Sequence, residues 1–143
     1  MGELLEAVKI LGIDKPNYRL SSDVQYLELM RKGLPIECVD VIADAISPSE
    51  RTFKYRIVSK ATLARRKSRR TLSPAQSVVV TRLASVWHLA LRIWKSSDAA
   101  RDFLYRPHAL LKRRRPIDLV LENELGAELV KNVLGRLEHG TAA

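Results

Sequence analysis

Residues 73–95, SPAQSVVVTRLASVWHLALRIWK, carry the strongest helix signal in the chain. Ser73 is followed three residues later by Gln76, which is the spacing of a capping box, and Pro74 suits the first helical position. Apolar side chains then recur at helical spacing until about Lys95. This stripe consists of Val79, Leu83, Val86, Trp87, Ala90 and Trp94. Because no convincing strand or internal repeat occurs elsewhere, the sequence predicts an all-α protein.

Upstream of this long helix, helical segments alternate with Gly and Pro breaks. The predicted helices span residues 4–11, 23–32, 35–46, 48–56 and 60–69, and a loop is expected at Lys15-Pro16-Asn17. Ser22, Ser47 and Ser59 are the predicted caps of the second, fourth and fifth helices, and Ser47 with Glu50 forms a second capping box. The second helix is expected to bury Val24, Leu27 and Met30 on one face and to end at Gly33.

Downstream, three further features are predicted. Ser97 caps a helix that ends near Tyr105, and Pro116 precedes a short turn. Asn123 caps a last helix from Glu124 to about Glu138, which Gly140 ends. The chain therefore contains seven or eight predicted helices joined by short connections.

Composition restricts the class of protein. The chain has 143 residues, of which 46% are hydrophobic and 29% charged, as in globular proteins that do not span a membrane. No apolar run approaches the roughly 18 residues of a membrane span, and no signal-peptide pattern opens the chain. Cys38 is the single cysteine, so an internal disulfide and a Cys-rich zinc site are excluded. These features favour a reducing cytoplasm.

The net charge of +9 is unevenly placed along the chain. Residues 51–100 hold 12 basic residues and one acidic residue, whereas residues 1–50 hold 5 and 9. From Arg51 to Leu72 there are nine Lys and Arg residues and no acid. Such a block is either a solvated face or an interaction surface. Its apolar residues, Phe53, Tyr55, Ile57, Val58 and Leu63, favour a folded surface that binds an anion.

Two short helices joined by a tight turn, the second capped by Ser and rich in Arg, have the layout of a helix-turn-helix. The beginning of the second helix would enter the major groove, and Leu63 would face the core. The predicted DNA-binding residues are Ser59, Lys60, Thr62, Arg65, Arg66, Arg69 and Arg70. A solvated Arg-rich helix and an RNA-binding basic helix are the open alternatives.

The sequence contains no clear pattern of catalytic or metal-binding residues. His88, His108 and His139 have no metal-binding spacing, and Asp98 and Asp102 form an acid pair one turn apart that lacks a partner. Cys38 lies in an apolar stripe and is interpreted as a small hydrophobic residue. No Gly-rich phosphate loop occurs. We expect no catalytic residue, no metal and no cofactor.

Short motifs follow one another in a fixed order from Leu72 onward. They are LSPAQS (72–77), RLA (82–84), AA (99–100), FL (103–104), Pro107, Leu110, PIDL (116–119), GA (126–127), Val130 and LGRLEHG (134–140). This ordered set resembles the toxin-binding domain of the Xre/MbcA/ParS antitoxin family. Residues 62–66, TLARR, resemble the recognition helix of the Xre-type helix-turn-helix in the same family. The resemblance extends over about residues 22–142.

The resemblance implies a type II antitoxin. Such a protein pairs with a RES-domain toxin that consumes or transfers the ADP-ribose part of NAD, covers its NAD pocket, and represses its own operon as a dimer on operator DNA. The implied architecture is an N-terminal helix-turn-helix bundle followed by a compact helical toxin-binding domain. The corresponding segments are residues 1–21, an N-terminal segment; 22–71, the helix-turn-helix domain; and 72–143, the toxin-binding domain.

The chain departs from the family pattern at three places. Ile57 stands where the family often has Gly in the helix-turn-helix turn, and a β-branched residue at positive φ is costly, so another turn shape is expected. Residues 112–115, KRRR, replace a Gly-containing turn and form either a second anion contact or a solvated loop. Asn123 replaces Ser or Thr, which is conservative because all three cap helices.

The last helix is the predicted inhibitory element. The toxin-binding residues implied by the resemblance and the helical pattern are Leu119, Asn123, Gly126, Lys131, Leu134, Arg136, Leu137, His139 and Gly140. We expect this helix and the tail Thr141–Ala143 to plug the toxin's NAD cleft, with Arg136 and His139 as polar anchors. Alternatively, Arg136 complements the helix dipole and His139 caps the helix.

Two functions from other classes stay open. One is a stand-alone helix-turn-helix regulator with a C-terminal dimerisation domain. The other is a basic structural protein associated with RNA.

Overall fold

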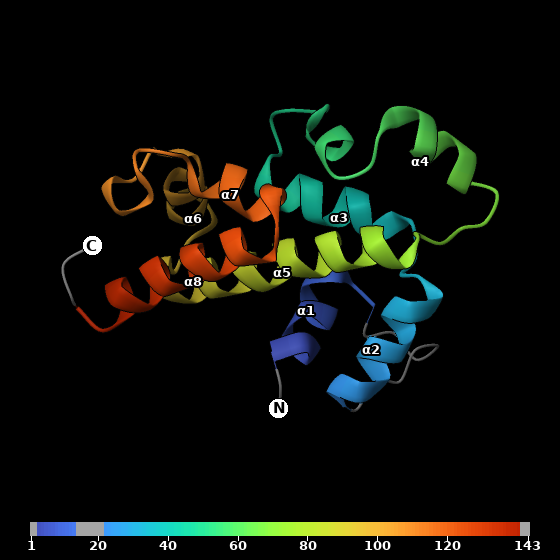
Figure 1. Cartoon of the computed structure of the whole chain (residues 1–143), viewed down its shortest axis with the longest axis horizontal. Coiled ribbons are helices and arrows are strands. Elements are labelled where there is room, and N and C mark those ends of the chain that lie inside the picture. The colour runs from blue at the N-terminus through green and yellow to red at the C-terminus, as the bar shows by residue number, and fades with distance from the viewer. Residues whose placement is uncertain (1–2, 14–21, 141–143) are drawn as a thin grey trace. The chain divides into compact units, whose positions relative to one another are not determined.

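The computed structural model describes residues 3–13 and 22–140, and every regular element in them is helical (Figure 1). The α-helices are α1 (Glu3–Leu11), α2 (Asp23–Lys32), α3 (Glu37–Ile46), α4 (Lys60–Arg66), α5 (Pro74–Trp94), α6 (Ser97–Tyr105), α7 (Pro116–Glu122) and α8 (Glu124–Glu138). Single 3-10 turns lie at Phe53–Arg56 and Ala109–Leu111. The predicted all-α class is confirmed. The predicted loop at residues 15–17 and the tail at 141–143 lie outside the described residues.

The chain forms two compact units, the first extending to Ser85 and the second beginning at Val86. Helix α5 contributes residues to both. The assignment of residues 22–71 and 72–143 as functional domains stays a prediction. Across the stretches that the structure describes, no helix is both long and apolar enough to cross a membrane.

The beginning of α5 confirms the predicted capping box. The Gln76 backbone N–H donates to Ser73 Oγ at 3.1 Å, and the Ser73 N–H donates to Gln76 Oε1 at 2.8 Å. Of the predicted stripe, Leu83, Val86, Trp87 and Ala90 are buried, Val79 is half-buried, and Trp94 is 39% exposed. The stripe is thus confirmed in the middle of the helix, whereas its last residue lies at the surface.

Hydrogen bonds to α5 organise the core of the first unit. The Tyr26 hydroxyl and Thr81 Oγ1 lie 2.7 Å apart in the core, and the Leu34 N–H donates to Ser77 Oγ at 2.9 Å. Tyr26 and Met30 therefore form the buried face of α2. The predicted inward face was wrong in part, because Val24 is 63% and Leu27 52% exposed. Gly33 ends α2 as predicted, with φ 109° and no room for a Cβ beside the Leu72 carbonyl.

The predicted capping box at Ser47 does not form. The Ser47 N–H donates to the Ala43 carbonyl and ends α3, and Ser49 and Glu50 lie in a turn rather than in a first helical turn. A 3-10 turn follows in place of the predicted helix 48–56, and it places Phe53 fully inside the core. Burial of this one aromatic residue overrides the local capping pattern.

Two boundaries in the second unit also differ from the prediction. Ser96, not Ser97, caps α6, because its Oγ accepts the Ala99 N–H at 3.0 Å. Pro116 begins the seven-residue helix α7 rather than preceding a turn, as its missing N–H allows at a first helical position. Asn123 caps α8 as predicted, with Oδ1 accepting the Gly126 N–H at 2.8 Å.

Candidate functional site

Helix α8 has one buried face and one exposed face. Its buried residues are Gly126, Ala127, Val130, Val133 and Leu134. On the other side, Leu125 is 68% and Leu129 43% exposed. Positions 125, 129, 132 and 136 are separated by four, three and four residues, so they share one face of the helix. Two exposed leucines are therefore followed on one face by the exposed residues Asn132 and Arg136. We call residues 125, 129, 132 and 136 the outer face of α8.

The predicted toxin-binding residues divide into two groups. Leu119, Gly126 and Leu134 are buried inside the unit, and a Cβ on Gly126 would collide with the Leu119 carbonyl oxygen. These residues position α8 and do not reach the surface. The half-buried residues are Lys131, which pairs with Glu128 at 3.9 Å, and Leu137. The exposed residues are Asn123, Arg136, His139 and Gly140.

The sequence reasoning missed Leu125 and Leu129. Both lie outside the apolar spacing that defines the buried face, and that mismatch was the available signal. Single exposed leucines are common, but two on adjacent turns of one helix face form a patch. The outer face of α8 therefore combines apolar surface with a cation near the end of the helix.

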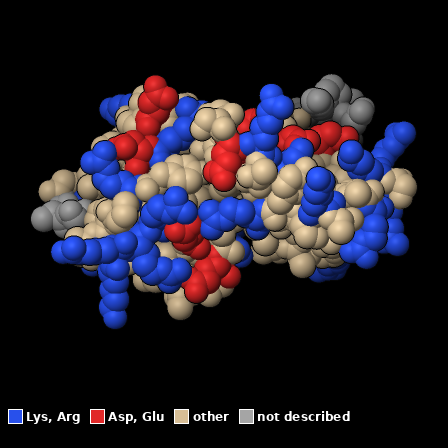
Figure 2. Space-filling model, turned by 90° about the horizontal axis from the view of Figure 1, so that it is seen from above, with Lys and Arg blue, Asp and Glu red and all other residues tan. Residues whose placement is uncertain are grey.

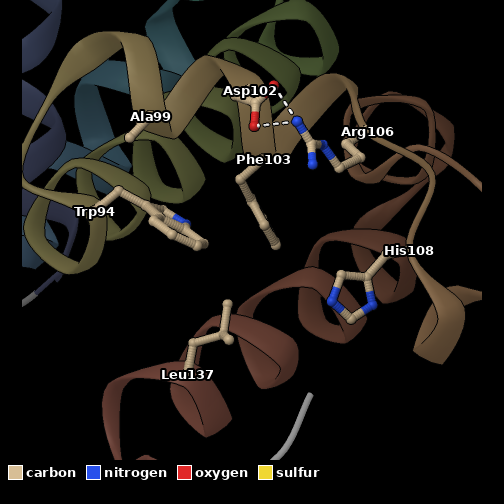
Figure 3. Close-up of a pocket in the computed structure, with 7 residues that line it drawn as sticks. All are labelled: Trp94, Ala99, Asp102, Phe103, Arg106, His108 and Leu137. Carbon is tan, nitrogen blue, oxygen red and sulfur yellow. Dashed lines mark hydrogen bonds and ion pairs between the residues drawn. The ribbon is translucent and has the colours of Figure 1, made fainter.

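A pocket of about 290 Å³ lies beside the last turn of α8 (Figure 3). Trp94, Phe103 and Leu137 point toward one another across it, and Ala99 lies at its edge. The Trp94 and Phe103 ring centroids are 6.0 Å apart, and Phe103 meets the His108 ring edge-on at 6.1 Å. The walls are therefore mainly aromatic and aliphatic.

The pocket lining also includes the polar residues Asp102, Arg106 and His108. Arg106 Nη2 contacts Asp102 Oδ2 at 2.9 Å, and outside the pocket Asp98 pairs with Arg101 at 3.3 Å. The two acids therefore have partners, contrary to the expectation from sequence. His108 Nδ1 accepts the Leu110 N–H at 3.2 Å. A neutral His108 imidazole then carries its proton on Nε2, the ring nitrogen that faces the gap in Figure 3.

The four basic residues at 112–115 are placed in two ways. Arg115 makes two 2.9 Å hydrogen bonds to the Asp118 carboxylate, and Arg114 pairs with Glu122 at 2.9 Å. Lys112 and Arg113 are exposed in a turn at φ 52° and 62°. Half of this basic cluster thus neutralises acids within the unit, and the other half faces solvent.

Residues 89–140 match the C-terminal toxin-binding domain of the Xre/MbcA/ParS antitoxins. The matched segment contains α6, α7, α8 and every residue that lines the pocket. This confirms the predicted resemblance for this part of the chain, which corresponds to a toxin-binding domain of antitoxins. None of the curated proteins compared with the chain matches it.

The matched segment does not include the basic surface of the first unit. Figure 2 shows Lys and Arg side chains gathered at the end where α4 lies in Figure 1. Ser59 caps α4 as predicted, since its Oγ accepts the Thr62 N–H at 3.2 Å. Arg65 Nη2 donates to Thr62 Oγ1 at 3.0 Å, and Lys60 and Arg65 are exposed. The start of α4 therefore groups hydroxyl and cationic side chains.

Other details of α4 differ from the prediction. The helix ends at Arg66 rather than near Arg69, and Arg66 Nε donates to the Thr71 carbonyl at 2.9 Å. Arg69 and Arg70 lie exposed in the following turn, where Arg70 has φ 61°. Leu63 is half-buried rather than in the core, and no residue of α4 is fully buried.

The turn before α4 agrees with the expectation for Ile57. This residue has φ −89°, so it avoids the left-handed region that a glycine would permit. The preceding element is the single 3-10 turn at Phe53–Arg56 instead of an α-helix. The helix-turn-helix assignment stays a prediction.

Proposed function

We propose that the chain is the antitoxin of a type II toxin–antitoxin system that binds a RES-domain toxin and blocks its NAD-consuming site. The observation that carries the proposal is the match of residues 89–140 to a toxin-binding domain, within which α8 exposes Leu125, Leu129 and Arg136 on one face. A surface of this composition suits association with another protein.

The two parts of the outer face have different roles in this proposal. Leu125 and Leu129 dock against the toxin, where full burial of a leucine contributes about 1.5–3 kcal/mol. Arg136 and His139 lie toward the end of α8, where they meet a cleft built for the anionic pyrophosphate of NAD. Docking therefore supplies the affinity, and the end of the helix supplies the block.

Co-expression with the cognate RES-domain toxin tests docking, with growth and cellular NAD as readouts. The unaltered chain preserves NAD, whereas the double variant L125K/L129K does not, because two lysines cannot be buried in an apolar contact. Val78→Lys is the matched control, since Val78 is 43% exposed, as Leu129 is, but lies in the first unit. Full protection by L125K/L129K would refute this docking face.

The blocking role needs variants that leave the unit intact. Leu137 lines the pocket and Glu138 pairs with Arg92 at 3.0 Å, so truncating the last turn would disturb the fold. The double variant R136A/H139A leaves both contacts in place. The toxin should still co-purify with this variant while NAD hydrolysis resumes. If R136A/H139A inhibits the toxin as well as the unaltered chain does, the blocking role is refuted. Arg136 would then only complement the helix dipole, and His139 would only cap the helix.

We also propose that the basic surface around α4 binds operator DNA as part of a homodimer and represses the operon. Supporting this are the exposed Lys60, Arg65, Arg69 and Arg70 side chains and the capped start of α4. The alternative, a stand-alone regulator, would use its C-terminal half for dimerisation. Co-purification with a RES-domain toxin separates the two proposals, because the stand-alone regulator would not bind a toxin.

A further inference from the structure

The pocket beside α8 is distinct from the outer face of that helix. Its lining comes from the end of α5 (Trp94), from α6, from His108 in the connection that follows α6, and from Leu137 in the last turn of α8, as Figure 3 shows. The docking role of Leu125 and Leu129 does not use it. Trp94 nevertheless leaves 39% of its surface exposed there, which is a large apolar group to leave in contact with water.

We infer that this pocket receives one large apolar side chain of the toxin, whose neighbouring peptide carbonyl accepts a hydrogen bond from His108. The inference rests on the proposed antitoxin function. All seven lining residues belong to the segment matched to a toxin-binding domain, so the toxin is the partner that this part of the chain is built to meet.

The size and lining of the pocket favour a side chain over a small-molecule ligand. Small-molecule sites are usually enclosed clefts of about 300–1,000 Å³, and this pocket is at the lower limit with about 290 Å³. Anchors at protein interfaces are single aromatic or aliphatic groups that fill such a recess and lose all contact with water. Trp94, Phe103 and Leu137 offer apolar contact on several sides of one inserted group.

The polar groups around the pocket define the rest of the occupant. Arg106 and Asp102 neutralise each other, so the rim does not require a charged ligand. His108 Nδ1 is already engaged by the Leu110 N–H, which leaves Nε2–H as the donor that faces the gap. The Trp94 indole N–H makes no hydrogen bond to the rest of the described chain. Two donors beside an apolar recess complement an acceptor next to an apolar side chain, which is the pattern of an ordinary peptide segment.

Fluorine NMR tests the inference without changing the fold. The chain has two tryptophans, Trp94 at the pocket and Trp87, which is 3% exposed. Labelled with 5-fluorotryptophan, the antitoxin gives two signals, which Trp94→Phe assigns. When unlabelled RES-domain toxin is added, the Trp94 signal should move and lose its solvent isotope shift, while Trp87 stays as the internal reference. A bound complex in which Trp94 keeps its solvent isotope shift would overturn the inference.

A pocket-filling variant measures how much the anchor contributes. Ala99 is half-buried at the pocket edge, and Ala99→Trp places an indole where the anchor would enter. We expect toxin affinity to fall at least about 30-fold, the loss typical of an interface anchor. Ala75→Trp is the control, because Ala75 is an exposed helical alanine in the first unit.

A third variant tests the hydrogen bond. His108→Asn keeps a side-chain acceptor for the Leu110 N–H but removes the Nε2–H donor, and it should weaken binding by about 3- to 10-fold.

The outcomes separate this inference from the proposed function. If the unaltered antitoxin binds the toxin and Ala99→Trp binds within 3-fold of it, the pocket is not an anchor site, although the antitoxin function stands. If the unaltered chain fails to bind the toxin, the proposed function falls and the pocket loses its named occupant. Binding that is lost in Ala99→Trp and kept in Ala75→Trp supports the inference.

Discussion

Two glycines on α8 should respond in opposite directions to the same substitution. A Cβ on Gly126 would collide with the Leu119 carbonyl oxygen, and that oxygen is part of the backbone of α7 and cannot rotate away. On Gly135, nine residues later in the same helix, a Cβ would meet nothing within 4 Å. Gly126→Ala and Gly135→Ala therefore form a matched pair in which only the local packing differs.

The expected magnitudes follow from two opposing terms. Alanine is favoured over glycine inside a helix by about 1 kcal/mol, and this gain applies at both positions. At Gly126 the helices must separate to admit the methyl group, which costs about 3 kcal/mol at the upper end of overpacking penalties. The net change in the free energy of unfolding is about −2 kcal/mol for Gly126→Ala and about +1 kcal/mol for Gly135→Ala.

The assay uses the placement of the tryptophans. Both Trp87 and Trp94 lie in the second unit, so thermal unfolding followed by tryptophan fluorescence reports on that unit. For a unit of this size, Gly126→Ala should lower the melting temperature by roughly 8–16 °C and Gly135→Ala should raise it by roughly 4–8 °C. Equal shifts of the same sign would refute the packing argument, because helix propensity alone would then decide both.

Three further results are expected. Arg65→Ala should reduce the slope of log affinity for DNA against log salt concentration by about one unit, the value of one phosphate contact, without changing stability. Arg66→Ala should also lower the melting temperature, because the Arg66 guanidinium donates a hydrogen bond to the Thr71 carbonyl. Ser73→Ala should cost about 1 kcal/mol in urea unfolding followed by circular dichroism, and an unchanged midpoint would contradict the capping box. Burial raises the pKa of Cys38 from 9.0 to about 12 and that of Tyr26 from 10.0 to about 12. The unfolded chain therefore loses these protons first, and the free energy of unfolding should fall as pH rises from about 9 to 12. The fall should be less steep in Cys38→Ala.

Capping residues and other local patterns in the sequence predicted most of the helices. Ser22, Ser59, Ser73 and Asn123 cap helices as expected, because each provides a side-chain oxygen where the first backbone N–H groups lack partners. The capping pattern at Ser47 failed although it contains the same residue types. Tertiary burial of Phe53 decided that segment, and local sequence carries no record of such a long-range contact.

The predicted buried faces were less accurate than the helix boundaries. In α2, Val24, Leu27 and Met30 have helical spacing, but Tyr26 with Met30 forms the inner face because the Tyr26 hydroxyl reaches Thr81 across the core. Tyrosine has both an apolar ring and a polar hydroxyl, so a hydrophobicity pattern does not predict whether it is buried. The pattern also carries no information about a buried hydrogen-bond partner for the hydroxyl. The exposed leucines at 125 and 129 were missed for another reason, because their spacing outside the buried stripe was not used.

The sequence placed the candidate site on the last helix, but it did not separate the buried residues of that helix from the exposed ones. Motif resemblance indicated Leu119, Gly126 and Leu134, all of which are buried, and Gly126 lies directly against the Leu119 backbone. Residues that hold a fold and residues that meet a partner produce the same kind of motif, and only burial distinguishes them. The pocket was invisible to sequence reasoning because Trp94, Phe103 and His108 come from three separate elements.

Three proposed roles therefore meet on one helix of the second unit. The outer face of α8 carries the two leucines proposed to dock, Arg136 and His139 lie at its end, and Leu137 forms part of the pocket. All three depend on the close approach of α8 to α7 at Gly126, where no side chain fits. Gly126→Ala should consequently weaken toxin binding even though Gly126 touches no partner, while the basic surface around α4, which belongs to the other unit, should keep its affinity for DNA. Loss of both activities together would mean that the two units do not fold independently.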